Sequence, residues 1–194
     1  VVPALTGRVL GALRMFCSAR FLTVGPGLKS GIKLRLDNPA QLGAELLCGA
    51  VAALEEGPGP LAVISADTAI SIMAVNGKQE LVGGVILPGP QLSLSALVQK
   101  TAQLPQIDLS APASSSILGK NTSACLQNGF VLGTAGLLDG LAERFQAELG
   151  PDIRFYATGN LPRTIREACR TPIEYREYLI TDGLYRIWQK NRKG

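Results

Sequence analysis

The side chains in this sequence that could do chemistry are mainly carboxylates and lysines. Among its 194 residues there is no histidine, which excludes a Ser-His-Asp or Cys-His site and leaves carboxylates, lysines and backbone amides as candidate catalytic groups. The segment Ser65-Ala66-Asp67-Thr68 lies between two β-prone runs. A nucleotide-binding meander would place its phosphate contacts at a tight corner of this kind, so this segment is the first candidate site.

Three β-prone runs surround this corner and position it. They cover Leu61 to Ala66, Ala69 to Val75 and Gln79 to Leu87, and together they predict a three-stranded meander. Asn76-Gly77, between the second and third runs, predicts a type I′ hairpin turn because both residues tolerate positive φ. We expect the meander to be the centre of the fold.

Helical spacing and capping residues predict the other elements. Helices are expected over residues 4–18, 37–56, 91–104, 121–149 and 161–169, and a last helix is expected to be capped by Thr181 and to run through Trp188. Strands are expected over residues 32–36 and 152–158, and a polar linker over 105–116. The glycine-rich loop at 25–31 lacks the spacing of a Walker motif, so we expect a plain connection there.

Four glycines interrupt the long helix predicted to end near residue 149. Each costs about 1 kcal/mol of helix propensity relative to alanine. Close packing against a neighbouring helix is the natural compensation, so we expect such a neighbour. The four positions are Gly129, Gly133, Gly136 and Gly140.

Composition favours a globular, soluble protein. Hydrophobic residues make up 46% and charged residues 18% of the chain, and no apolar run reaches the ~18 residues of a membrane-spanning helix. The net charge of +4 is concentrated in the last third of the sequence. Because only 5% of the residues are aromatic, a solvated helix face is favoured there over a nucleic-acid interface, which stays open as a third possibility.

The four cysteines are widely spaced and form no metal-binding pattern. They contain no CxxC pair, and the chain has no histidine to complete a zinc site. We expect reduced, buried thiols in a cytoplasmic protein. Their positions are Cys17, Cys48, Cys125 and Cys169.

One segment carries a specific family resemblance. DNPAQLGAELLCGAVAA, residues 37–53, resembles the DNPxxxGADRxxNAVAA segment of type III pantothenate kinases. Five further blocks fall in the order and spacing of that family, so the sequence is identified as a member of it. These blocks are VGPGLKSG at 24–31, GGVILPG at 83–89, TAQLPQI at 101–107, LGKNTSACLQNGFVLG at 118–133 and ATGN at 157–160.

The resemblance implies an α/β fold of the ribonuclease H-like, actin-like ATPase type. Residues 57–194 would form a complete second subdomain, a three-stranded meander plus helices, and residues 1–56 a partial first subdomain with the interdomain helix. Val1-Val2-Pro3 resembles a segment inside the family's first subdomain, so we expect the family's opening DxGNT phosphate loop to be missing from this chain. The resemblance also implies a cytoplasmic homodimer with no nucleic-acid or membrane partner.

The family reaction transfers the γ-phosphate of ATP to pantothenate in the first step of coenzyme A synthesis. The resemblance implies ATP, Mg²⁺ and a monovalent cation, K⁺ or NH₄⁺, as cofactors. Glu45 stands where the family has the aspartate that acts as general base, and its extra methylene matters because a misplacement of ~1 Å can cost ~100-fold in rate. Leu46 replaces the arginine that would hold the substrate carboxylate, and Leu36 replaces a tyrosine of the pantothenate pocket.

Other positions implied by the resemblance are partly retained. The backbone of Gly43 and Ala44 and the hydroxyl of Thr122 would hold pantothenate. Thr68 would contact the ATP phosphates, and Gly159 would lie near the adenine.

Three positions near the expected nucleotide depart from the family pattern. Ser65 stands where an aspartate would serve the monovalent cation. Asp67 and Asn160 both stand where the family has glycine, and a carboxylate at position 67 would repel phosphate in a partly dry site. Two hypotheses follow. The chain is a working kinase that tolerates these variants, or it is a catalytically degenerate pseudoenzyme, natural or deliberately altered, that is retained for binding or regulation.

Overall fold

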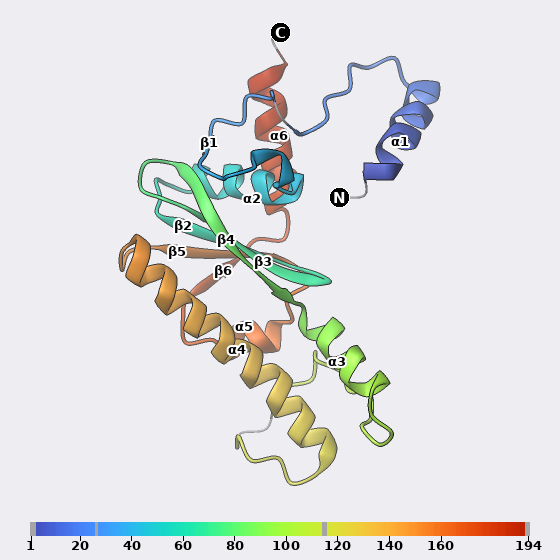
Figure 1. Cartoon of the computed structure of the whole chain (residues 1–194), viewed down its shortest axis with the longest axis vertical. Coiled ribbons are helices and arrows are strands. Elements are labelled where there is room, and N and C mark those ends of the chain that lie inside the picture. Colours follow the sequence, from blue (N-terminus) through green and yellow to red (C-terminus); the bar gives the residue numbers. More distant parts are fainter. Residues whose placement is uncertain (1–2, 26, 114–115, 193–194) are drawn as a thin grey trace.

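A six-stranded mixed sheet forms the middle layer of the computed structural model, which describes residues 3–25, 27–113 and 116–192 (Figure 1). The strands are β1 (Lys33–Leu34), β2 (Leu61–Ala66), β3 (Ala69–Val75), β4 (Glu80–Pro88), β5 (Arg154–Gly159) and β6 (Ile173–Tyr175). Their order across the sheet is β1-β4-β3-β2-β5-β6. The β2–β3 and β3–β4 pairs are antiparallel, and the other three pairs are parallel. The predicted meander is therefore confirmed.

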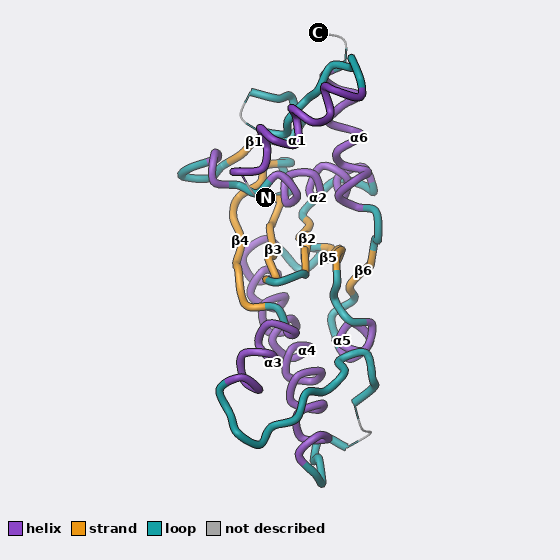
Figure 2. Tube along the Cα trace, turned by 90° about the vertical axis from the view of Figure 1, so that its right-hand side faces the viewer, coloured by secondary structure: helices purple, strands orange, loops and turns teal. Residues whose placement is uncertain are grey.

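Helices cover both faces of this sheet (Figures 1 and 2). On one face lie α2 (Ala44–Glu55) and α6 (Leu179–Asn191), and on the other lie α4 (Thr122–Leu149) and α5 (Arg163–Ala168). Leu61 and Val63 of β2 belong to the first core, and Ala62 and Ile64 to the second. Because β2 is buried on both faces, its sequence is an uninterrupted apolar run.

Two helices extend from this layered body. α1 (Pro3–Phe16) stands apart from the sheet in Figure 1, and α3 (Pro90–Gln99) follows the meander. Several apolar side chains of α1 are exposed, among them Leu5, Val9, Leu13 and Phe16. None of the described helices combines the length and the apolar composition that a membrane crossing requires.

The turn between β3 and β4 differs from the predicted type I′ hairpin. Positive φ falls on Gln79 (58°) and not on Asn76 or Gly77. The side-chain oxygen Oδ1 of Asn76 accepts hydrogen bonds from the backbone N–H groups of Lys78 (2.9 Å) and Glu80 (3.0 Å). An asparagine that bonds its own downstream backbone stabilises a longer turn, so the two-residue prediction was wrong.

The helix predicted over residues 37–56 is divided in two. Asn38 accepts a hydrogen bond from the N–H of Ala40 and begins a short 3₁₀ helix, η1 (Pro39–Gln41). Leu42 and Gly43 are then extended, with ψ of 125° and 135°, before α2 begins. The sequence Asp37-Asn38-Pro39 is typical of a helix start with a capping residue, and Asn38 does cap a helix here, but it is the short one.

Further element boundaries also differ from expectation. α3 ends at Gln99, five residues before the predicted end, and β6 was not predicted. Thr181 does not cap α6, because it lies inside the helix and its hydroxyl donates to the carbonyl of Tyr178 (2.9 Å). For α4, Asn121 and Thr122 were both candidate caps, and Asn121 is the one that caps the first turn, by accepting from the N–H of Ala124 (2.8 Å).

The expected neighbour for the glycines of α4 is not found within the described chain. A Cβ added at Gly129, Gly133 or Gly136 would meet nothing within 4 Å, and one at Gly140 would meet only the guanidinium of Arg144, at 3.5 Å. No helix of the described chain therefore provides the close packing that was predicted for these glycines. The face is open.

The cysteines are free, as predicted, but not uniformly buried. Cys48 is buried and Cys169 is half-buried, whereas Cys17 and Cys125 are exposed. Burial was thus a wrong prediction for the last two.

Candidate functional site

Glu45 lies in the first turn of α2 with its carboxylate folded over the helix start. A Cβ on Gly43 would lie 3.2 Å from Oε1 of Glu45. The second carboxylate oxygen, Oε2, is buried and has no hydrogen-bond partner. A helix N-terminus stabilises such a negative charge, but an unpartnered buried acceptor is costly. A group of this kind needs an explanation, and a catalytic role is one of those available.

The packing of α2 on β2 determines at which end of the sheet Glu45 lies. A Cβ on Gly49 would lie 3.1 Å from Cγ1 of Val63, so the two elements touch at this level. Glu45 is one helical turn before Gly49 on the same helix face. Because α2 returns through residues 56–60 to the start of β2, the first turn of α2 lies toward the end of β2 that carries Ser65.

A row of three hydroxyl groups crosses the sheet at this end. Ser65 of β2 is in register with Ser71 of β3 and with Thr158 of β5, so the three side chains share the face covered by α2 and α6. Thr158 is buried and donates a hydrogen bond to the carbonyl of Glu177 (3.4 Å). Ser65 and Ser71 are half-buried, so theirs are the hydroxyl groups of this row that keep some exposure to solvent.

The cations implied by the resemblance do not fit the residues present. Ser65 supplies a neutral oxygen where an aspartate was expected. Within the described residues, no three His, Cys, Asp or Glu side chains come together in a group that could hold a metal ion. We therefore derive no chemical step through a protein-bound cation.

The corner between β2 and β3 is held tightly by neighbouring backbone. The N–H of Gly89 donates to the carbonyl of Thr68 (2.9 Å), and a Cβ on Gly89 would collide with the carbonyl oxygen of Asp67. Gly159 has φ of 82°, and a Cβ there would collide with the carbonyl oxygen of Ala66. Only glycine fits such contacts. The Thr68 side chain itself is exposed.

Beside Thr68 lies a hollow of about 470 Å³. It is bounded by the β2–β3 corner, the start of α3, the loop at 108–110 and the residues after β5. At the adjoining ends of β2 and β5, Nδ2 of Asn160 donates a hydrogen bond to Oδ1 of Asp67 (3.0 Å). The hollow has the size of a small-molecule site.

The structure does not bring all the predicted site residues together. Leu46 is buried and Leu36 is half-buried, and both pack in the core between α2 and the sheet. Thr122 is exposed at the first turn of α4, at the lower end of Figure 1, whereas α2 lies in the upper half. A single chain therefore cannot present Thr122 and Glu45 to one small substrate.

A second hollow was not indicated by the sequence. The glycine-rich loop, of which Gly25 and residues 27–31 are described, borders a space of about 590 Å³ that reaches Ala44. Nζ of Lys190 in α6 donates to the carbonyl of Ser30 (3.2 Å) and holds this loop in place. The loop is a connection, as predicted, but it also borders the start of α2.

Burial and charge around Glu45 also affect the neighbouring Cys48. Burial, and to a smaller extent the negative charge of Glu45, raise the pKa of the Cys48 thiol to about 11. The thiol therefore stays protonated and is a poor nucleophile at neutral pH. This leaves Glu45 as the group near the start of α2 that can accept a proton.

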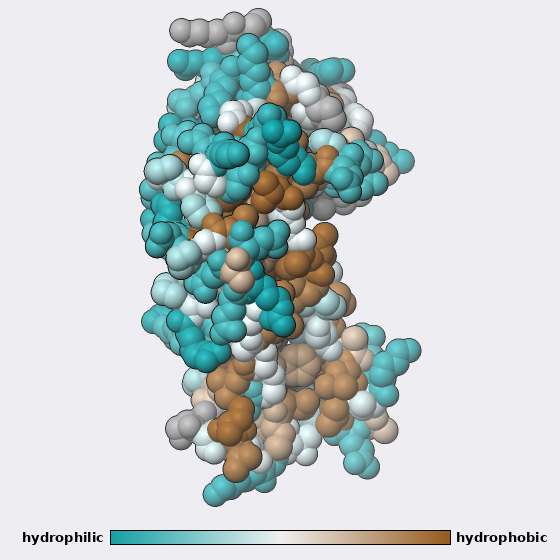
Figure 3. All heavy atoms as spheres, turned by 60° about the vertical axis from the view of Figure 1, so that its left-hand side comes forward, coloured by the Kyte–Doolittle hydropathy of each residue, from teal (hydrophilic) through white to brown (hydrophobic). Residues whose placement is uncertain are grey.

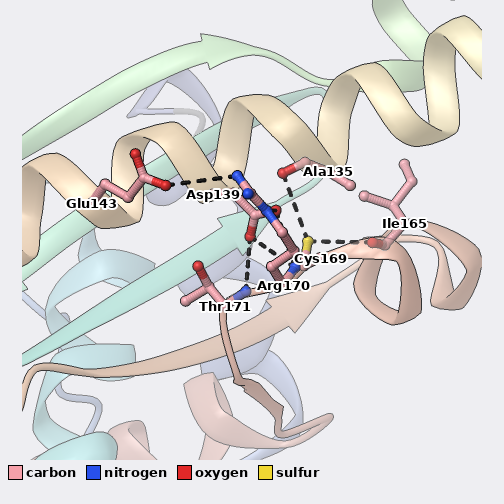
Figure 4. A network of polar contacts seen from close by, with 7 residues as sticks. All are labelled: Ala135, Asp139, Glu143, Ile165, Cys169, Arg170 and Thr171. Atoms are coloured by element: carbon pink, nitrogen blue, oxygen red, sulfur yellow. Dashed lines mark hydrogen bonds and ion pairs between the residues drawn. The ribbon is translucent and has the colours of Figure 1, made fainter.

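Sequence reasoning also missed a buried carboxylate that anchors α4 (Figure 4). Asp139 is 3% exposed, and its oxygens accept hydrogen bonds from the N–H groups of Arg170 (3.0 Å) and Thr171 (2.9 Å). Burial alone would raise the pKa of Asp139, but these hydrogen bonds outweigh it and hold the pKa below its ordinary value. The guanidinium of Arg170 also lies 3.6 Å from Glu143. The cluster is structural, because it ties the middle of α4 to the segment that follows α5.

The fold and site define a class of protein: a mixed α/β domain with a polar ligand corner at one end of its sheet. A crystal structure from Campylobacter jejuni, described as a conserved putative Baf family transcriptional activator, has the same fold. It matches with a TM-score of 0.61 and 19% sequence identity, covering 100% of this chain and 81% of that one.

Sequence comparison defines the family. The family model described as type III pantothenate kinase matches residues 1–144. The type III pantothenate kinase of Koribacter versatilis is 35% identical over 192 residues, which cover 99% of this chain and 69% of the relative. Those of Geotalea uraniireducens and Dehalococcoides mccartyi strain CBDB1 are 36% and 38% identical, with 75% and 72% of the relative covered. The chain belongs to the type III pantothenate kinase family.

Proposed function

We propose that this chain catalyses the transfer of the ATP γ-phosphate to pantothenate, giving 4′-phosphopantothenate. Residues 57–194 would be the second actin-like subdomain, and residues 1–56 would belong to the first subdomain and the interdomain helix. The observation that carries the proposal is the buried, unpartnered oxygen of Glu45 at the start of α2. Family membership supports the choice of substrates. A cytoplasmic location stays a prediction.

In this proposal, Glu45 accepts the proton of the pantothenate hydroxyl as that oxygen attacks the γ-phosphorus and the bond to the β-phosphate oxygen breaks. The backbone of Gly43 and Ala44 holds pantothenate, and the exposed hydroxyl of Thr68 contacts the phosphates. Leu46 offers no donor to the substrate carboxylate, which costs on the order of 2 kcal/mol of binding. Weak substrate binding follows.

A coupled assay of pantothenate-dependent ADP release tests the kinase proposal. Glu45→Gln keeps the shape of the side chain but removes the base, so turnover is expected to fall by at least ~100-fold. Glu55→Gln, at the exposed far end of the same helix, is the matched control and is expected to keep wild-type turnover. Absence of wild-type turnover at millimolar substrate would contradict the proposal.

A degenerate binding or regulatory homologue is the second candidate function. It is favoured by the Asp67–Asn160 hydrogen bond at the expected phosphate corner and by the burial of Leu46 in the core. This candidate predicts that pantothenate binds without any ADP release. Calorimetric titration with pantothenate, run beside the kinase assay, distinguishes the two.

The homodimer is also part of the proposal. The open glycine face of α4, formed by Gly129, Gly133 and Gly136, suits close approach of a second helix. Figure 3 shows apolar surface at the lower end of the molecule, where Figure 1 places α3 and the first half of α4. A second copy docked there could also supply the Thr122 that one chain holds away from Glu45.

A further inference from the structure

The last turn of α6 holds the glycine-rich loop through the side chain of one asparagine. Oδ1 of Asn191 accepts a hydrogen bond from the backbone N–H of Lys29 (3.1 Å), and Nδ2 donates to the backbone carbonyl of the same residue (3.0 Å). Nδ2 also donates to the carbonyl of Ile187, one helical turn earlier (2.7 Å). The amide group therefore bonds the loop backbone as both donor and acceptor, and its bond to the helix keeps it in this orientation.

A second side chain of α6 holds the next residue of the loop. Nζ of Lys190 donates to the carbonyl of Ser30 (3.2 Å), and a Cβ on Gly31 would collide with this ammonium group. Gly31 has φ of 87°, a conformation that favours glycine. The buried hydroxyl of Ser30 also bonds both the N–H (3.2 Å) and the carbonyl (3.1 Å) of Ile32. Residues 29–31 are thus held both by α6 and by their own local bonds.

The same helix packs against α2, which borders the same hollow as the loop. α6 lies beside α2 (Figures 1 and 2), and Ile187 of α6 shares a hydrophobic core with Leu47 of α2. Leu47 and Ala44 line the hollow of about 590 Å³, and so does the glycine-rich loop. Both elements that border this hollow are therefore held by α6.

The proposed function would place pantothenate in this hollow. In that proposal the backbone of Gly43 and Ala44 holds the substrate, and Glu45 accepts the proton of its hydroxyl group. Ala44 lines the hollow, and its volume is that of a small-molecule site. A mobile loop would weaken binding there, because the ligand would then have to bear the entropy cost of ordering the loop.

We propose that Asn191 and Lys190 are positioning residues for pantothenate, which hold the glycine-rich loop as a preorganised wall of the substrate hollow. This inference rests on the proposed function, because that proposal supplies the ligand. Neither side chain is among the described residues that line the hollow, so each acts on the substrate through the loop. Their removal should therefore weaken the binding of pantothenate and leave the chemical step unchanged.

Calorimetric titration with pantothenate, run beside the assay of ADP release, tests this on the full chain. Asn191→Ala removes both bonds to Lys29, so the Kd and KM for pantothenate are expected to rise at least ~tenfold, with kcat and the KM for Mg-ATP unchanged. Lys190→Met keeps the alkyl chain but loses the bond to Ser30, so a smaller rise is expected. Gln189→Ala, on the same turn of α6, is the matched control, because no side-chain hydrogen bond of Gln189 is found in the described chain. It is expected to bind pantothenate like wild type.

Amide hydrogen exchange reports on the loop without any ligand. In Asn191→Ala the N–H of Lys29 loses its acceptor and is expected to exchange at least ~tenfold faster, while the N–H of Ile64, in the buried strand β2, keeps its protection. Unchanged exchange at Lys29 overturns the inference, because the loop would then be held without Asn191.

The remaining outcomes separate this inference from the proposed function. Unchanged pantothenate affinity in Asn191→Ala overturns the positioning role and leaves the kinase proposal standing. Equal weakening of pantothenate and Mg-ATP also overturns it, since a general loss of structure has that effect. Pantothenate binding that depends on Asn191 but gives no ADP release supports the inference and contradicts the kinase proposal. Failure of wild type to bind pantothenate contradicts both.

Discussion

Gly183 of α6 lies directly against the backbone carbonyl of Cys48 in α2. A Cβ at position 183 would collide with the carbonyl oxygen and carbon of Cys48. Two helices can approach so closely only where one of them has no side chain. Because α2 carries Glu45, this contact also helps to hold the helix of the candidate base in place.

Gly183→Ala is therefore expected to destabilise the fold. Alanine favours helix by about 1 kcal/mol over glycine, but forcing α2 and α6 apart costs more, so the free energy of unfolding should fall by roughly 1–3 kcal/mol. Urea denaturation followed by circular dichroism measures the change. Gly140→Ala on α4, where only a movable arginine side chain is near, serves as the control and should be neutral or stabilising. A stabilised Gly183→Ala variant would contradict the close contact.

The glycine face of α4 leads to a prediction about assembly. Gly133→Leu places a large side chain where the proposed partner helix would approach, so it should weaken the dimer at least tenfold while the monomer stays folded, because leucine favours helix. Analytical ultracentrifugation over a range of concentrations gives the dissociation constants. Gly7→Leu makes the same change at another open helical glycine, in α1, and should leave assembly unchanged. A wild-type chain that is still monomeric at about 100 micromolar refutes the homodimer.

The sequence predicted those features that depend on local periodicity. β2 and β3 begin and end where the apolar runs do, because each strand alternates between two buried faces. The turn at Asn76 was missed because its geometry depends on side-chain hydrogen bonds to Lys78 and Glu80. Residue type and spacing do not reveal such bonds.

The candidate site was predictable only in part for the same reason. Family resemblance indicated Glu45 and Thr68, and the structure adds that Glu45 has a buried oxygen without a partner. The resemblance could not indicate that Thr122, at the start of the 28-residue helix α4, lies far from Glu45. That separation is set by how α4 packs. Asp139 was missed because its partners, Arg170 and Thr171, come 31 and 32 residues later in the chain.

The contribution of Asp139 to the stability of the fold is predicted to depend on pH. Its pKa is lower in the folded protein than its ordinary value, so ionised Asp139 stabilises the fold above an unfolded pKa of about 4. This stabilisation is lost as the pH falls from there through the lowered folded pKa. Asp139→Asn retains one acceptor oxygen but loses the charge, so at pH 7 the free energy of unfolding should fall by about 1–3 kcal/mol.

Urea denaturation of wild type and Asp139→Asn at several pH values checks this. The difference in the free energy of unfolding between the two proteins should have its full size near pH 7. It should shrink as the pH falls below about 4, because wild-type Asp139 then becomes protonated. Asp152→Asn, which removes an exposed carboxylate from the turn before β5, should differ little from wild type at any pH. A difference for Asp139→Asn that stayed constant down to pH 2 would show that the anchor of α4 to the segment after α5 does not depend on the charge of Asp139.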